Sequence, residues 1–317
     1  MERKPVYEYI TDYLNSHGAR DKELCSLGGD FHLPRKETGK IPFADGAMDG
    51  ISIYHMGSPD ITEEDMEEIG AGISFAAGGE YGKADEIFES FCNRIRVVNF
   101  IDELQRYIID HAAELNAGNI YRYALHLLGE SPDVESVKAG MMILELFKPN
   151  DTVKDMVRTL ALSDEFTIYA VFLMRNWEDG QTEILNAAKR TAGWGRVHAV
   201  HYIEPETDEI KEWLLREGVN NWIMPAYSGL DCYEKAGVEE LLDKGPLSYE
   251  EIHGILGIID AMLDEGPVRG ISTVREPEKM LGKVLFHAKK EPSLQPEDCK
   301  VVDNILQWLD KAGGEGN

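Results

Sequence analysis

Two histidines three residues apart, His198 and His201, lie in the stretch GWGRVHAVHYIEP, which otherwise has the composition of a helix. On a helix this spacing places the two rings about 60° apart around the axis, so both could bind one metal ion if a third ligand came from elsewhere. Glu204 continues the same three-residue spacing. The alternative is that one ring packs inside the protein. The pattern of the neighbouring helices decides between the two interpretations.

A second group of potential ligands lies in a glycine-rich stretch between residues 25 and 55. Asp-x-His spacing can place two ligands together on an extended chain, and loops often carry function. The group consists of Cys25, Asp30, His32, Asp45, Asp49 and His55. No fixed spacing among them selects a metal, so we expect solvated loop side chains and no metal site. His32 and His55 remain candidates for a ligand-binding loop.

Large aromatic residues are concentrated later in the chain, where four of the five tryptophans lie within 177–222. Trp, Tyr and Arg are enriched at binding hot spots. The candidates for a binding surface are Tyr169, Arg175, Trp177, Trp194 and His198. Because tryptophan is usually well buried, the alternative for most of these rings is a place in the core. We expect Tyr169 and Trp194 to be exceptions, because they lie at or near a helix start.

Motifs of the common catalytic mechanisms are absent from the sequence. It has no Gly-x-x-x-x-Gly-Lys-Ser/Thr phosphate loop, no Gly-x-Ser-x-Gly elbow and no His-Glu-x-x-His pair. Gly70-Ala71-Gly72 stands in a helical context without a preceding strand, which argues against a dinucleotide site. We therefore predict no catalytic residues and no cofactor.

The charge balance limits the possible partners. The chain of 317 residues has 58 acidic and 32 basic side chains, a net charge of −26. This charge repels nucleic acids and anionic membranes, and no basic patch compensates for it. The four cysteines form no Cys-x-x-Cys pair, and the sequence has no apolar run of membrane-spanning length. We expect a cytoplasmic protein with reduced thiols.

Helical periodicity dominates from about Thr62 onward. Ser248-Tyr249-Glu250-Glu251 has the pattern of a capping box, and Pro296 is well placed to begin the last helix. Residues 21–60 have too many glycines and prolines for a continuous helix, and the pattern of 50–54 suits a strand of a β-hairpin. The expected organisation is an N-terminal helix with an irregular module over 1–60, followed by a helical domain over 61–317.

Three segments of the helical region align without gaps: SVKAGMMIL (136–144), TIYAVFLMR (167–175) and RVHAVHYIE (196–204). A second amphipathic helix precedes the latter two, so the unit is a pair of short antiparallel helices, and stacked pairs build a continuous core. In this register His198 has the position of Lys138 and Tyr169, whereas His201 has the position of Met141 and Phe172. We therefore predict that His201 packs as a partly buried ring and that His198 lines a groove.

The opening of the first segment resembles a known repeat. Pro132 to Ala139, PDVESVKA, is similar to the Asp-x-x-Val-Arg-x-x-Ala opening of HEAT-type repeats, and Ser163 to Ala170 is a looser copy. The spacing of 31 and 29 residues between the aligned alanines is closest to the short repeats of phycobilisome-lyase-like HEAT proteins. The resemblance covers roughly residues 119–230. It implies an armadillo-like superhelix and leaves the activity open.

The sequence as a whole predicts an all-α protein, an α-solenoid of antiparallel helix pairs with a small irregular N-terminal module. The expected function is that of a non-catalytic binding or scaffold protein whose partner is a protein with a basic surface, as when an acidic immunity protein neutralises a nuclease toxin. We expect neither nucleic acid nor membrane as a partner. The alternative is an enzyme or small-ligand protein with a pocket between the 21–60 module and the repeat groove, using His32, His55 or His198.

Overall fold

The computed structural model describes residues 4–17, 27, 31–34, 43–57, 59–266 and 268–314. These residues form helices joined by turns and loops, and no strand occurs among them, which confirms the predicted all-α class. The chain divides into two compact units, Met1–His198 and Ala199–Asn317. Within the described residues, no helix has the length and apolar character needed to cross a membrane.

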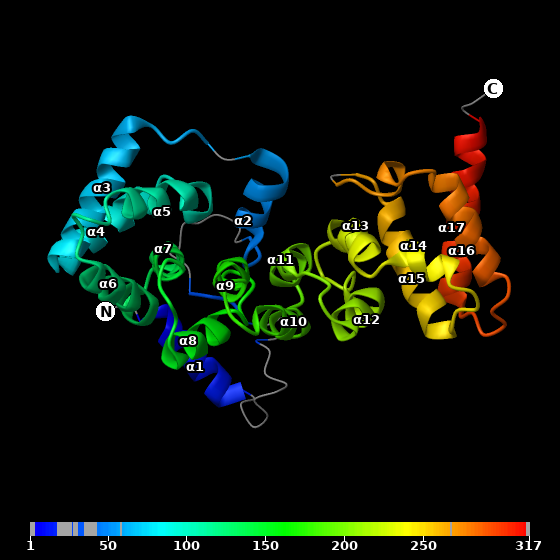
Figure 1. Cartoon of the computed structure of the whole chain (residues 1–317), viewed down its shortest axis with the longest axis horizontal. Coiled ribbons are helices and arrows are strands. Elements are labelled where there is room, and N and C mark those ends of the chain that lie inside the picture. The colour runs from blue at the N-terminus through cyan, green and yellow to red at the C-terminus, as the bar shows by residue number, and fades with distance from the viewer. Residues whose placement is uncertain are drawn as a thin grey trace. The chain divides into compact units, whose positions relative to one another are not determined.

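Unit 1 contains the helices up to the division of the chain, and α11 crosses that division (Figure 1). Its elements are α1 (Val6–His17), α2 (Ala47–Ile51), the π-helical turn η1 (Ser52–Met56), α3 (Glu63–Gly78), α4 (Tyr81–Cys92), the 3₁₀ turn η2 (Val97–Asn99), α5 (Ile101–Asp110), α6 (Ala117–Glu130), α7 (Val134–Leu144), α8 (Asp151–Leu160), α9 (Thr167–Met174), α10 (Gly180–Arg190) and α11 (Trp194–Tyr202).

Unit 2 is also helical in its described part. Its elements are α12 (Asp208–Glu217), α13 (Ala226–Lys235), α14 (Val238–Asp243), α15 (Tyr249–Leu263), the 3₁₀ turn η3 (Ile271–Thr273), α16 (Pro277–Ala288) and α17 (Pro296–Gly314). The capping box predicted at Ser248 is confirmed, because its side chain accepts from the Glu251 amide while the Glu251 carboxylate accepts from the Ser248 amide. Pro296 begins α17 as predicted.

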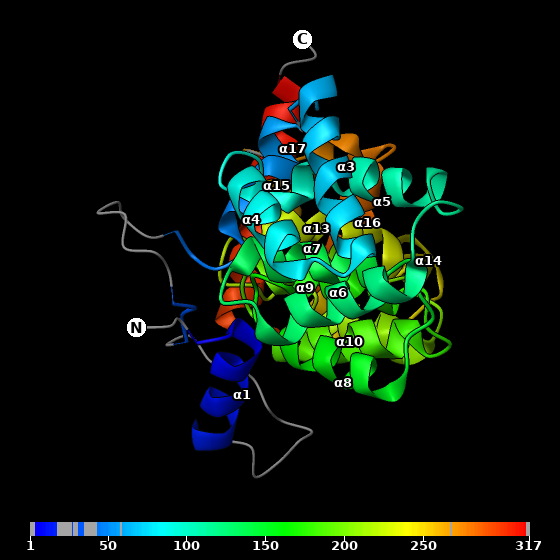
Figure 2. The ribbon, with the colours of Figure 1, turned by 90° about the vertical axis from the view of Figure 1, so that its left-hand side faces the viewer.

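The helices that contain the first two aligned segments, α7 and α9, pack against each other, and α8 and α10 each pack against α9. In Figure 1, α7, α9 and α11 follow one another, and Figures 1 and 2 both show α8 and α10 below α7 and α9. The aligned residues of the three segments are all buried, namely Val137, Ala139, Ile168, Ala170, Val197 and Ala199. The periodicity of the sequence therefore predicted the burial of these apolar residues, but the intervening Lys138, Tyr169 and His198 are buried as well.

The hairpin expected at residues 50–54 is wrong. These residues continue α2 into η1, and helix α2 begins after Gly46, whose φ of 77° favours glycine. A Cβ atom at Gly46 or Gly50 would overlap Trp194, so the two glycines allow this short helix to lie directly on the indole. That tertiary contact outweighs the strand-like alternation of Ile51-Ser52-Ile53, because β propensity depends strongly on context.

Candidate functional site

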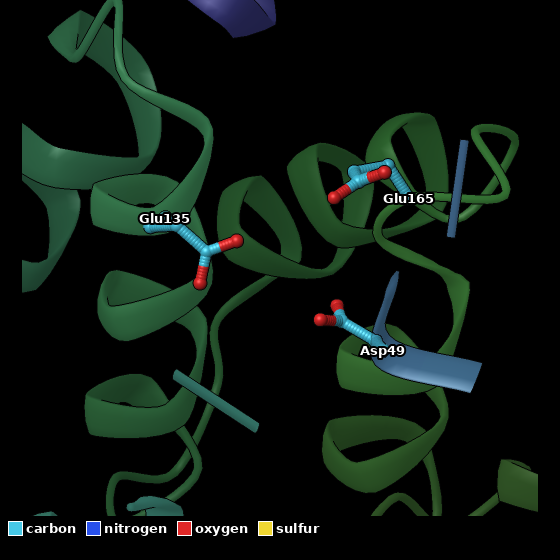
Figure 3. A group of neighbouring side chains, drawn as sticks. All are labelled: Asp49, Glu135 and Glu165. Carbon is cyan, nitrogen blue, oxygen red and sulfur yellow. The ribbon is translucent and has the colours of Figure 1, made fainter. Parts of the chain in front are cut away.

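Lys138 lies at the centre of a buried cluster of charges. Its side chain, on α7, has no exposed surface, and its Nζ atom lies 2.7 Å from Asp49 Oδ2, 2.8 Å from Glu135 Oε1 and 2.6 Å from Glu165 Oε1. Figure 3 shows the carboxylates of Asp49, Glu135 and Glu165 pointing toward one another. An ammonium group has three protons, so each proton of Lys138 is directed to one carboxylate.

Arg96 is the second cation of the cluster and precedes η2. Its Nε lies 2.7 Å from Asp49 Oδ1, and its Nη2 lies 3.0 Å from Glu135 Oε1 and 3.2 Å from Glu165 Oε1. The side chain is 28% exposed, so the guanidinium forms the edge of the cluster nearest to solvent. Charge-assisted hydrogen bonds of this kind are about twice as strong as neutral ones.

Neutral donors complete the coordination of the carboxylates. The Tyr169 hydroxyl donates to Asp49 Oδ2 at 2.9 Å. The backbone amide of Val97 donates to Glu135 Oε2 at 2.8 Å, and that of Gly46 donates to Glu165 Oε2 at 2.7 Å. Every carboxylate oxygen of the three acids therefore accepts at least one hydrogen bond. This is the condition under which a buried charge is tolerated.

Local sequence spacing brings some of these groups together. Glu135 and Lys138 are three residues apart on α7, so they share a helix face. Glu165 lies in the turn two residues before α9 begins, four residues before Tyr169. Asp49 comes from α2, 89 residues before Lys138. The tertiary fold alone joins Asp49 to the other members.

Asp49 and Lys138 stabilise each other's charged forms. Burial by itself would raise the pKa of Asp49, but the charges of Lys138 and Arg96 outweigh it and lower this pKa from 3.8 to about 2. Burial would lower the pKa of Lys138, but the three carboxylates, Asp49 first, raise it above its ordinary value. Three carboxylates and two cations leave the cluster with a formal charge of −1.

Asp49, Glu135 and Glu165 offer one oxygen each within 4.8 Å of one another, a spacing suited to a metal ion. The ammonium of Lys138 occupies their centre, however, and a divalent cation would need Lys138 to lose its proton and move away. The raised pKa of Lys138 opposes that loss. The donor set therefore fits an internal cation supplied by the protein better than a metal.

A row of three equivalent side chains extends from this cluster. We call Lys138, Tyr169 and His198 the polar column, because they have the same position in the three aligned segments. All three are fully buried. Residues 43–57 contact each of them: Asp49 binds Lys138 and Tyr169, while the Tyr54 hydroxyl lies 3.4 Å from Nδ1 of His198.

The open binding surface predicted from the aromatic residues is wrong for most of its members. The structure buries Tyr169, Trp177, Trp194 and His198 and exposes only Arg175 of this set. Two causes account for the burial. Residues 43–57 cover the polar column and Trp194, and the cationic groups of Lys154 and Arg158 lie 4.9 Å and 5.7 Å from the centre of the Trp177 ring.

The two histidines of α11 have the opposite environments to those predicted. His198 is fully buried, with its ring stacked on Tyr54 and tilted against Trp194, so it lines no open groove. The His201 side chain is 43% exposed, and its Nδ1 lies 2.9 Å from Asp231 Oδ2, so its predicted packing position is wrong. The alignment identified the shared column, but it contained no information about the segment that covers that column.

The expectation of solvated loop side chains agrees with the exposure of His32 and His55 and is wrong for Asp49. His32 and His55 are both exposed, and the backbone carbonyl of His32 accepts from the Tyr9 hydroxyl at 3.3 Å. Asp49, expected to be a solvated loop residue, is fully buried, because Lys138 and Arg96 compensate its charge. Cys25 and Asp30 lie outside the described residues.

A cavity of about 230 Å³ adjoins the cluster. Its apolar wall on the N-terminal side is formed by Leu33, Pro34, Ala44 and Met48, and its charged wall includes Arg96, Glu135 and Glu165. It therefore lies between the 21–60 module and the helical body. Neither His32, His55 nor His198 is among its lining residues.

Sequence reasoning missed Arg96, Glu135, Lys138 and Glu165 as members of a site. The available signal was Lys138 itself, a lysine inside the apolar stretch SVKAGMMIL, where every residue from Ser136 to Leu144 is buried. A buried lysine requires nearby carboxylates, and Glu135 lies one turn before it.

Comparisons with protein-family models, with curated proteins and with solved structures found no match to this chain.

Proposed function

We propose that this chain is a HEAT-like helical-repeat protein that binds a partner protein and carries out no catalysis. The saturation of the buried cluster is the observation on which this proposal depends. The side chains best suited to acid–base or metal chemistry, Asp49, Glu135 and Glu165, are all bonded to Lys138 and Arg96. None of the three carboxylates is left to act on a substrate without breaking the network.

The shared burial pattern of the aligned helices supports the repeat architecture. Residues on either side of the polar column are equivalent in type and are buried in α7, α9 and α11. A helix pair of this size cannot bury its apolar face alone, so neighbouring pairs stack on it. Proteins of this construction commonly present extended surfaces to other proteins.

Charge supports a partner with a basic surface. An exposed acidic stretch precedes and begins α12 in unit 2, and its members are Glu204, Glu206, Asp208, Glu209 and Glu212. Together with the net charge of −26, this stretch favours association with a basic protein and speeds the encounter at low salt.

The test is affinity capture with the full chain as bait, followed by measurement of the salt dependence of binding. Asp208, Glu209 and Glu212 are changed to lysine in one variant. The matched control changes Glu63, Glu64 and Glu67, which are also exposed and have the same positions at the start of α3. We expect the α12 variant to lose a captured protein that wild type and the α3 control retain.

Capture of no protein above background, or equal loss in both variants, would contradict a specific partner on this surface. Because both variants place three lysines at the same helix positions, a general effect of reduced negative charge would appear in both.

The cavity beside Arg96 favours a second candidate, a small-ligand protein. A volume of about 230 Å³ with an apolar wall and a charged wall suits a small molecule with one polar end. Filling the cavity with Met48→Trp should abolish any ligand-induced rise in Tm that a screen of small molecules detects. Ligands whose stabilising effect is unchanged in that variant would exclude this cavity as their site.

A further inference from the structure

We propose that residues 43–57 occupy a binding site for a helical segment of the partner, one that carries a carboxylate and an aromatic ring. The segment would then act as a tethered internal ligand that the partner displaces. This inference depends on the proposed binding function and specifies which part of the partner enters the repeat. The site consists of the polar column with Arg96 and Trp194.

The first support is a ready-made receptor for one carboxylate. Asp49 is held by Lys138 Nζ at 2.7 Å, Arg96 Nε at 2.7 Å and the Tyr169 hydroxyl at 2.9 Å. These donors come from α7, from the residue before η2 and from α9, none of which belongs to residues 43–57.

Removing Asp49 would leave this receptor neutral but incomplete. Glu135 and Glu165 would balance Lys138 and Arg96, while an Nζ proton, the Nε proton and the Tyr169 hydroxyl would lose their acceptor. Once residues 43–57 have left, water solvates these donors, and a carboxylate that replaces the water regains charge-assisted hydrogen bonds to two cations. A partner's aspartate or glutamate would satisfy the same three donors.

The second support is an aromatic surface that accepts a helix closely. Gly50 lies against the Trp194 ring, and a Cβ atom there would overlap the indole. Tyr54 stacks on Trp194 with ring centres 6.0 Å apart and on His198 with ring centres 5.8 Å apart. Gly46, Asp49, Gly50 and Tyr54 are spaced as on one helix face.

The site therefore selects a helical segment with small residues against Trp194, an acid beside Lys138 and an aromatic ring over His198. Another copy of this chain would carry the same segment, but two chains of net charge −26 repel each other. A different protein with a basic surface and one such helix fits the charges better.

The third support is the small apolar area that fixes residues 43–57. Within α2 and η1 only Ala47, Asp49 and Gly50 are buried, and η1 has no buried residue. Phe43 and Met56, near the two ends, are 57% and 73% exposed. Elements with few buried apolar contacts open more readily than the rest of a protein, so this segment is suited to displacement.

The experiment uses the full chain carrying Gly50→Val, which forces a branched side chain into the Trp194 ring and displaces the segment while every receptor residue stays unchanged. A labelled synthetic peptide of residues 43–57 is titrated into this variant and into wild type, with fluorescence anisotropy as the readout. We expect saturable binding to the variant and binding at least tenfold weaker to wild type, whose site is occupied.

Two peptides test the chemistry. The Asp49→Asn peptide should bind at least tenfold more weakly, because it loses the charge that Lys138 and Arg96 recognise. The Asp45→Asn peptide is the matched control: it loses the same charge at a residue whose carboxylate accepts from the Leu33 amide, and it should bind like the original. Absence of binding by the original peptide, or equal weakening by both changes, would overturn the inference.

Amide hydrogen exchange of the wild-type chain provides a test that does not depend on the folding of the variant. We expect residues 47–56 to exchange at least a hundredfold faster than α7. Exchange of both elements in one cooperative step would overturn the inference, because the segment would then be an integral part of the core. Either negative result leaves the capture experiment on the α12 surface unaffected, so the two proposals fail independently.

Discussion

Replacing Lys138 with methionine removes the central charge of the buried cluster at nearly constant volume. Asp49, Glu135 and Glu165 would then share Arg96, with oxygens of all three within 4.8 Å of one another. Removing one partner from a buried ion pair costs about 3–5 kcal/mol, because the remaining charge stays buried without compensation. We expect the free energy of unfolding at pH 7 to fall by about this amount. For a unit of 198 residues, Tm should fall by roughly 6–20 °C.

The pH dependence provides a sharper check. In wild type the pKa of Asp49 is lowered from 3.8 to about 2, so its stabilising contribution is present above pH 3.8 and is lost as the pH falls toward 2. This shift corresponds to about 2 kcal/mol. In Lys138→Met the carboxylates repel one another and take up protons more readily. The stability difference between variant and wild type should therefore shrink as the pH falls from 7 to 4.

Urea unfolding followed by circular dichroism measures these differences, and hydrogen exchange assigns them to unit 1. Lys83→Met is the control, since Lys83 pairs with Glu80 on the surface, where both side chains are at least half exposed. Such a pair contributes less than about 1 kcal/mol. A loss below about 1 kcal/mol for Lys138→Met, or an equal loss at pH 4 and pH 7, would refute the ionised network.

Three further predictions follow from the charged groups of both the cluster and its surroundings. Burial raises the pKa of Asp164 to about 6 despite hydrogen bonds from the Gly193 and Gly195 amides, so the stability of the wild-type protein should fall as the pH rises from 4 to 6. The Asp164→Asn variant should lack this fall when its free energy of unfolding is measured with urea. The same pH dependence in the variant and in wild type would contradict the prediction. Burial lowers the pKa of His126, but Asp85 and Glu130 outweigh it and raise that pKa, so the contribution of the charged ring is present below pH 6.5 and is lost as the pH rises through the folded-state value. His126→Gln should therefore destabilise the protein more at pH 5.5 than at pH 8.5 in thermal melts, and the reverse order would contradict this. Finally, Lys138→Ala should leave the carboxylates of Asp49, Glu135 and Glu165 able to bind Mn²⁺, which calorimetry would detect. Tight binding of Mn²⁺ by wild type would show that the Lys138 ammonium does not occupy the space between these carboxylates.

The sequence allowed the helices and many of their buried apolar residues to be predicted, because these depend on neighbours a few residues apart. The capping box at Ser248 and the start of α17 at Pro296 are examples, since each needs only the residues of one helical turn. The burial of the aligned Val137, Ile168 and Val197 is another, because apolar residues that recur at helical spacing are typical of a core. The HEAT-like relation of these segments stays a prediction.

The surroundings of the polar column could not be predicted in the same way. Asp49 lies 89 residues before Lys138 and 120 residues before Tyr169, so no local pattern connects them. In the sequence, Gly46 and Gly50 have the pattern of loop residues. In the structure they are needed because a Cβ atom at either position would overlap Trp194, against which the short helix packs.

The sequence by itself determined an acidic, all-α chain with three segments that align with one another and place Lys138, Tyr169 and His198 at one shared position. Only the tertiary structure decided that residues 43–57 cover this column, that His198 is buried while His201 is exposed, and that Lys138 is the central cation of three carboxylates. The physical reason is how far apart along the sequence the interacting residues lie. Helix formation and periodicity depend on a few adjacent residues, whereas the compensation of a buried charge can come from any part of the chain that the fold brings within hydrogen-bond distance.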